Sequence, residues 1–183
     1  MQTEIIIAGF GGQGVLFGGQ VLAFAAMDTG REVTWIPSYG PEMRGGTANC
    51  TVVIADDEIG SPLVKSPSLA IALNLPSFDK YEPALRAGGT LIVNQSMVDR
   101  GPRRDDIQVV LVPCSQIAEQ IGDRRLLNMV AVGALLTALP ELQVPDVERA
   151  LQAHLPERHK RLLPMNYEAL KRGYSAALAA APH

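Results

Sequence analysis

The chain has 183 residues, of which 47% are hydrophobic and 19% are charged, as in ordinary soluble globular domains. This composition excludes a disordered protein or a coiled coil, and the length suits one core, so we expect a single domain over residues 1–183. Acidic residues exceed Lys and Arg by 19 to 16, which excludes the basic surface of a nucleic-acid-binding protein. No apolar run approaches the roughly 20 residues of a membrane span, and the start lacks the basic segment of a signal peptide. We therefore expect no membrane partner and a cytoplasmic location.

Strands and helices alternate along the chain as far as residue 112. The continuous apolar run at 3–8 predicts a strand buried on both faces, and a glycine-rich stretch then separates it from a helix at 15–27. Composition and turn signals predict further elements, which are strands at 32–36, 49–54, 69–73, 90–93 and 108–112 and a helix at 77–86. This order favours an α/β, three-layer Rossmann-like domain with a mostly parallel sheet.

The rest of the chain predicts a helical C-terminal part. Residues 126–139 are apolar on every helical face, which is typical of a helix buried in a core or against a partner. Pro145 and Pro164 mark the starts of two further helices, because proline is tolerated in the first helical turn.

Two sets of charged or titratable side chains fall in this helical part. His154, His159 and His183 are expected to be solvated and far from any ligand-binding edge of the sheet. A basic group is typical of an exposed helical face and less often of an anion or partner site. Its members are Arg158, Lys160, Arg161, Lys171 and Arg172.

Gly9, Gly11 and Gly14 satisfy the G-x-G-x-x-G spacing between a predicted strand and a predicted helix. A dinucleotide site also needs an acidic residue at the end of the second strand, and the sequence there reads Ile36-Pro37-Ser38. Three interpretations stay open: a dinucleotide site, glycines that only permit a tight turn, or exposed amides that receive another phosphate-bearing group or a partner's backbone. We favour the third.

A second Gly- and Pro-rich loop occupies residues 38–46. It is either an exposed turn or a loop that carries an aromatic anchor, Tyr39, and a cation, Arg44, into a site. This loop, the glycine loop, Asn74 and Asn94 each follow a predicted strand. Because ligands bind beyond the carboxyl ends of parallel strands, we expect all four segments at one functional edge of the sheet.

The sequence offers no catalytic machinery of its own. It contains neither a G-x-S-x-G nucleophile motif nor an H-E-x-x-H motif. Cys50 and Cys114 lie far apart and lack neighbouring ligands, so we expect two reduced structural thiols and no metal.

With the segments GFGGQGV (9–15) and SYGPEMRGGTANC (38–50), the sequence resembles the gamma subunit of 2-oxoacid:ferredoxin oxidoreductases. The likeness extends to residues 56–62, 73–77, 128–133 and 166–173 and so spans nearly the whole chain. The second motif is more similar to the 2-oxoglutarate branch than to pyruvate subunits. The segment Gly122-Asp123 departs from the Gly-Asn of many relatives.

The resemblance implies a subunit of an enzyme that oxidatively decarboxylates a 2-oxoacid, forms acyl-coenzyme A and passes electrons to ferredoxin. It implies that thiamine diphosphate and iron-sulfur clusters are carried by alpha, beta and delta subunits, whereas this chain binds none alone and takes coenzyme A as a ligand. It further implies a coenzyme A-facing site and subunit interface without catalytic residues. The binding residues that the resemblance implies are Gly11, Gly12, Gln13, Gly14, Tyr39 and Arg44. The candidate binding site also includes Ser38 and Gly45 of the second loop and, from their positions after strands, Asn74 and Asn94.

Overall fold

A computed structural model describes residues 1–38 and 47–180. The strands are β1 (Gln2–Phe10), β2 (Glu32–Ser38), β3 (Thr47–Ala55), β4 (Leu69–Ala72), β5 (Thr90–Asn94) and β6 (Gln108–Val112). The helices are α1 (Val15–Asp28), α2 (Leu75–Tyr81), α3 (Cys114–Ile121), α4 (Leu127–Leu135), α5 (Val144–His154) and α6 (Leu163–Ala179). Short 3-10 turns lie at Gln95–Met97, Arg124–Leu126, Leu136–Ala138 and Glu157–Leu162. The predicted strands all occur, with ends that agree to within two residues.

The described strands form one six-stranded sheet in the order β2-β3-β1-β4-β5-β6. Strands β1, β4, β5 and β6 run parallel, β3 is antiparallel to both of its neighbours, and β2 therefore points the same way as β1. The predicted mostly parallel sheet is confirmed. Pro37 is tolerated because β2 is an edge strand, where a missing N–H breaks no central ladder.

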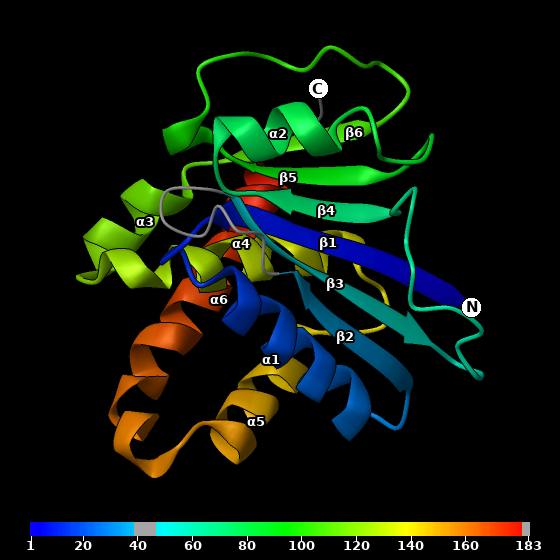
Figure 1. Cartoon of the computed structure of the whole chain (residues 1–183). Coiled ribbons are helices and arrows are strands. Elements are labelled where there is room, and N and C mark those ends of the chain that lie inside the picture. The colour runs from blue at the N-terminus through cyan, green and yellow to red at the C-terminus, as the bar shows by residue number, and fades with distance from the viewer. Residues whose placement is uncertain (39–46, 181–183) are drawn as a thin grey trace.

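Helices cover both faces of this sheet (Figure 1). The side chains of Ile5 and Ile7 pack into the core beneath α1, α4, α5 and α6, whereas Ile6 faces a smaller core beneath α2. Burial on both faces explains the unbroken isoleucine run. The three-layer arrangement predicted from the sequence is confirmed.

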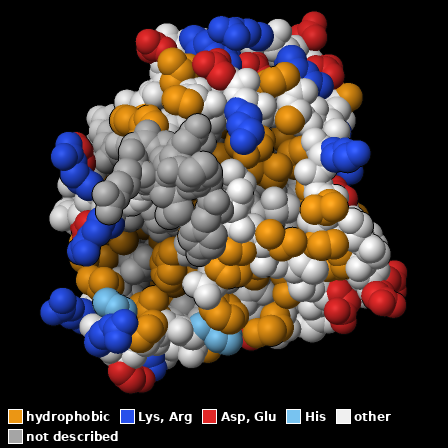
Figure 2. Space-filling view, in the orientation of Figure 1, with side chains coloured by type: hydrophobic (Ala, Val, Ile, Leu, Met, Phe, Trp, Pro, Cys, Tyr) orange, Lys and Arg blue, Asp and Glu red, His pale blue; other side chains and the backbone are white. Residues whose placement is uncertain are grey.

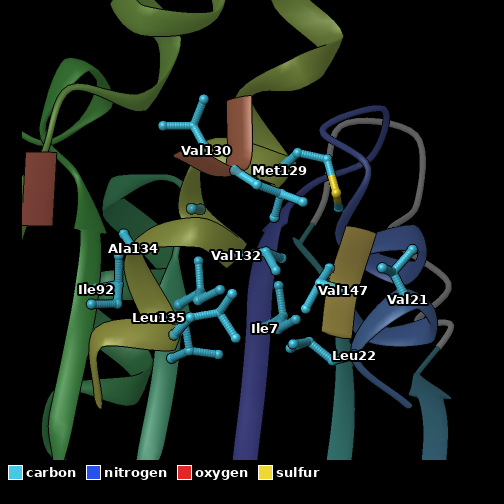
Figure 3. Packing of buried hydrophobic residues seen from close by; sticks show 14 of the residues in the cluster. Ile7, Val21, Leu22, Ile92, Met129, Val130, Val132, Ala134, Leu135 and Val147 are labelled. Carbon is cyan, nitrogen blue, oxygen red and sulfur yellow. The ribbon is translucent and has the colours of Figure 1, made fainter. Parts of the chain in front are cut away.

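Helix α4 is central to the larger core (Figure 3), and every one of its nine residues is buried. Figure 3 shows Val132 and Leu135 of α4 near Ile7 of β1 and Leu22 of α1. The all-round apolar composition thus corresponds to a helix enclosed by its neighbours, as predicted.

Helix α2 differs from its predicted range. It begins two residues early, because the Asn74 side chain accepts a hydrogen bond from the Ser77 N–H and caps the helix at 2.9 Å. It ends at Tyr81, shortly before Pro83, which cannot continue the hydrogen-bond ladder.

Candidate functional site

The glycine loop connects β1 to α1 at the edge of the sheet where β2, β4 and β5 also end. Gly12 and Gly14 adopt φ values of 88° and 74°, in the left-handed region that favours glycine. At Gly14 a Cβ atom would collide with the Asn128 side chain, whereas at Gly12 no atom of the described residues lies within 4 Å of the Cβ position. Gly14 is therefore required by packing, and Gly12 leaves an open approach to the backbone.

Gln13 closes the gap between the ends of β1 and β4. Its side-chain oxygen accepts a hydrogen bond from the Phe10 N–H at 2.6 Å, and its Nε2 lies 3.5 Å from the Leu73 carbonyl oxygen. Helix α1 covers one face of the sheet and α2 the other, so the loops after β1 and β4 diverge here. Such a topological switch point is where α/β proteins bind ligands.

Asn74 and Asn94 lie at the predicted edge, and both are buried. The Asn94 amide donates to the Leu73 carbonyl at 3.2 Å and to the Ser115 hydroxyl at 3.0 Å, and its oxygen accepts from the N–H groups of Ser96 and Ser115. Asn94 therefore ties the ends of β4, β5 and β6 together. Asn74 caps α2, and its Nδ2 has no hydrogen-bond partner among the described residues.

The second loop is described only at its two ends. Ser38 is exposed at the end of β2 and is paired in register with Asn49 of β3. Tyr39, Arg44 and Gly45 lie outside the described residues, so their predicted site roles stay predictions.

A cavity of about 330 Å³ opens directly beside the glycine loop. Its walls come from the loop, α1, the turn before α4, and the region where α5 leads into α6. Gly12, Gly14, Phe17, His159 and Met165 are among the lining residues. The expectation that the histidines lie far from this edge is wrong for His159, because the Glu157–Leu162 turn places it in the wall of the same cavity as Gly12 and Phe17. The long separation in sequence conceals this proximity.

The sequence prediction also missed Asn128, which fixes the glycine loop. Its Nδ2 donates to the Gly14 carbonyl oxygen at 3.1 Å, and its Oδ1 accepts from the Met129 N–H at 2.8 Å. The signal available was a polar residue at the start of an otherwise apolar helix. Nearby, Asp123 accepts two hydrogen bonds from the Arg125 side chain, which holds the pKa of that carboxyl below its usual range.

The start of α1 places a partial positive charge at this edge of the sheet. Its first turn contains no acidic residue, and no side chain of the described residues caps its N-terminus. The unpaired N–H groups and the helix dipole therefore leave a partial positive charge beside the exposed Gly12 backbone. This arrangement suits an anionic or carbonyl-bearing group and supplies no nucleophile or general base.

The two cysteines are unsuited to metal binding. Burial raises the pKa of Cys50 and of Cys114 from 9.0 to about 12, so both thiols stay protonated at neutral pH. Among residues 1–38 and 47–180 no group of three or more His, Cys, Asp or Glu side chains could hold a metal ion. In the same part of the chain, no helix is long and apolar enough to cross a bilayer.

Comparison with known proteins places these features in a family context. The family described as "Pyruvate ferredoxin/flavodoxin oxidoreductase" matches residues 4–176. The 2-oxoglutarate synthase subunit KorC of Methanothermobacter marburgensis is 40% identical over 163 residues, which is 85% of this chain and 88% of that protein. The ketoisovalerate oxidoreductase subunit VorA of the same organism is 39% identical over 152 residues. That alignment covers 81% of this chain and 32% of VorA, so the chain spans about a third of the length of this relative.

Two solved structures share the fold along 98% of the chain. The gamma subunit of a keto/oxoacid ferredoxin oxidoreductase from Geobacter sulfurreducens superposes with a TM-score of 0.86 at 28% identity and is covered over 98% of its length. A 2-oxoglutarate:ferredoxin oxidoreductase from Magnetococcus marinus, solved with 2-oxoglutarate, coenzyme A and succinyl-CoA bound, gives a TM-score of 0.87. Its identity of 23% and coverage of 32% of that chain make this a likeness of fold.

Proposed function

Because the chain belongs to the pyruvate ferredoxin/flavodoxin oxidoreductase family, we propose that it is the gamma subunit of a 2-oxoacid:ferredoxin oxidoreductase. The whole chain, residues 1–183, acts as one gamma domain, and the enzyme converts its 2-oxoacid and coenzyme A into acyl-coenzyme A and carbon dioxide. Electrons released in this oxidation pass to ferredoxin. The similarity to KorC over most of both chains supports 2-oxoglutarate as the substrate.

The exposed backbone at Gly12 is the observation that supports a binding role for this chain. The loop joins an exposed left-handed glycine to a helix start that lacks acidic residues and a side-chain cap. Such a site accepts a phosphate or an amide oxygen from a ligand. Coenzyme A carries both groups, and we assign its contact surface to residues 11–14 and the exposed Ser38.

The other predicted binding residues have distinct parts in this proposal. Tyr39, Arg44 and Gly45, which follow Ser38 in the sequence, remain predicted binding residues. Asn74 and Asn94 support this surface indirectly, because both are buried, Asn74 caps α2 and Asn94 ties the ends of β4, β5 and β6 together. Arg44 supplies a cation for a coenzyme A phosphate or for a carboxylate of a partner.

The catalytic groups belong to other chains in this proposal. The alpha, beta and delta subunits carry thiamine diphosphate and the iron-sulfur clusters, since the two cysteines of this chain are buried, protonated thiols. Thiamine diphosphate supplies the carbanion chemistry of decarboxylation when it is bound there. We place the enzyme in the cytoplasm, a reducing compartment in which free cysteines are ordinary.

A dinucleotide site is the alternative, and the sheet topology argues against it. Strand β3 lies between β1 and β2, so the end of β2 is two strand spacings, about 10 Å, from the end of β1. In a dinucleotide fold β2 lies directly beside β1 and presents an acidic residue to the ribose. Here β2 ends with Ile36, Pro37 and Ser38.

Purification of the chain with its native partners tests the proposal. The complex is assayed with 2-oxoglutarate, ketoisovalerate and pyruvate, each with coenzyme A and ferredoxin. We expect acyl-coenzyme A formation that is fastest with 2-oxoglutarate, together with binding of coenzyme A in preference to NAD. A chain that purifies alone and binds NAD stoichiometrically would establish the dinucleotide alternative instead.

A further inference from the structure

A groove runs along the outer side of α1, away from the sheet. It consists of the cavity beside the glycine loop, of about 330 Å³, and a second cavity of about 360 Å³ farther along the helix. The two cavities share Phe17, Leu155 and His159 in their walls and are therefore adjacent. We call this feature the α1 groove.

The floor of the α1 groove is apolar because α1 carries a second apolar stripe. Val21 and Leu22 are buried in the core, whereas Phe17 and Phe24, seven residues apart on one helical face, are only partly buried. Phe24 stacks on the His154 ring with the ring centroids 4.0 Å apart. This stacked pair forms the far end of the groove. Apolar area left in water is unfavourable by about 25 cal/mol per Å², so covering this stripe is a source of binding energy.

The border of the groove is positively charged. Arg158 lines the second cavity, and Arg161 lies in the same 3-10 turn, Glu157–Leu162. Both are exposed, and neither has a carboxylate within ion-pair distance in the described part of the chain; Arg158 donates a hydrogen bond to the His159 ring at 3.0 Å. Nearby Arg125 and Lys160 are already neutralised by Asp123 and Glu157. Figure 2 shows hydrophobic side chains and pale blue histidines at the lower left of the molecule, with blue Lys and Arg side chains beside them.

These features specify the chemistry of an occupant. Two adjacent cavities along about 15 Å of helix accept large apolar side chains spaced by one or two helical turns. The two free guanidinium groups require carboxylates next to those side chains. An amphipathic helix with Leu or Phe on one face and Asp or Glu beside it meets both requirements.

We propose that the α1 groove is the docking site for such an acidic amphipathic helix from a partner subunit of the oxidoreductase. This inference rests on the proposed function, which makes the chain one subunit among several.

The test compares three full-length variants for affinity toward the co-purified native partner subunits. Arg158→Glu/Arg161→Glu reverses the free charges, and Phe17→Ala removes the apolar anchor shared by both cavities. Lys65→Glu/Lys80→Glu is the matched control, because both lysines are exposed, lack an acidic partner among the described residues and give the same change in net charge. Dissociation constants are measured by competition with labelled wild-type chain at low and moderate salt, and thermal melting checks that each variant is folded.

We expect each groove variant to bind its partners about tenfold or more weakly, whereas the control binds normally. The arginine variant should also lose most of the salt dependence of binding. Wild-type affinity in both groove variants would overturn the proposal, as would an equal loss in the control or a raised KM for coenzyme A with unchanged subunit affinity. Failure of the wild-type complex to oxidise any 2-oxoacid would refute the proposed function separately, because affinities are measured independently of turnover.

Discussion

In the glycine loop, Gly9 and Gly14 are needed for packing, whereas Gly12 is available for binding. Gly9 is enclosed, since a Cβ there would lie 2.9 Å from the Leu73 Cβ, and Gly14 is enclosed by Asn128. Gly12 has left-handed φ but open space around it. Substitution at Gly12 therefore affects the backbone and whatever approaches the loop, without disturbing the core.

Gly12→Val should lower the stability of the isolated chain by about 1 to 2 kcal/mol through backbone strain, and should reduce activity of the complex far more. Gly30→Val is the matched control, because Gly30 has φ 82° and also has nothing within 4 Å. Melting temperatures and steady-state kinetics against coenzyme A make the comparison. If the two variants lose equal activity, the loop has no binding role.

At the scale of elements, two helices meet through glycines. Gly133 of α4 faces the backbone of Leu170, and Gly173 of α6 faces the backbone of Val130. A Cβ at Gly133 would lie 2.8 Å from the Leu170 carbonyl carbon, and one at Gly173 would lie 2.7 Å from that of Val130. The reciprocal contact allows α6 to lie directly on α4 and close the larger core.

Gly173→Ala should destabilise the fold by about 3 kcal/mol or more, because the methyl group meets backbone that cannot rotate away. Gly18→Ala on α1 is the control, since its Cβ would make an ordinary contact of 3.4 Å with Val132. There the higher helix propensity of alanine should leave stability unchanged or raise it by up to about 1 kcal/mol. Urea unfolding of both variants measures the difference in the free energy of unfolding. Equal stability would show that α4 and α6 move apart to accommodate the methyl group.

A buried carboxylate secures the loop before β6. Glu82 is 2% exposed, accepts hydrogen bonds from the N–H groups of Arg103 and Arg104, and pairs with Arg100 at 2.8 Å. The Arg100 guanidinium in turn lies 3.9 Å from the Phe78 ring centroid. Helix α2 and the 98–107 loop are thereby joined on the smaller core.

Glu82→Gln should destabilise the chain by about 3 kcal/mol, because it leaves Arg100 without its buried counter-charge. Amide exchange should accelerate first in residues 98–107, since their anchoring acceptor is weakened. Asp79→Asn, which alters the more exposed partner of Arg100, is the control and should cost less than about 1 kcal/mol. Unchanged exchange in that loop would show that Glu82 does not hold it.

For the whole molecule, burial of both thiols makes the free energy of unfolding decrease as the pH rises above 9.0. The folded-state pKa values of Cys50 and Cys114 are raised from 9.0 to about 12, so between these values the unfolded chain releases protons that the folded chain keeps. The stabilisation is fully present below pH 9 and is lost as the pH rises. Each thiol should remove about 1.4 kcal/mol per pH unit in that range.

Chemical denaturation at pH 8, 9 and 10 checks this expectation. Cys50→Ala should flatten the pH dependence by about half while lowering stability at pH 8 through the lost packing of the sulfur. A thiol reagent should modify the wild-type chain only at the rate of unfolding. Rapid modification of either cysteine in the folded chain would show that the thiols are accessible.

The sequence alone determined the strands, most of the helices and the glycine loop of this protein. Local patterns suffice for these features, because an isoleucine run buried on both faces and an all-apolar helix leave few alternatives in water. The motifs at 9–15 and 38–50 likewise identified the family before any contact was known. Asn74 and Asn94 were correctly placed at the edge, since each directly follows a strand.

Only the tertiary structure decided how these segments meet. Four arrangements bring together residues that are far apart in the chain. Antiparallel β3 lies between β1 and β2, and His159 lines the same cavity as Gly12. Asn128 donates a hydrogen bond to Gly14, and α4 packs closely on α6. Such contacts depend on how whole helices pack and carry no local periodic signal. Long-range packing therefore created both the site at the glycine loop and the α1 groove beside it.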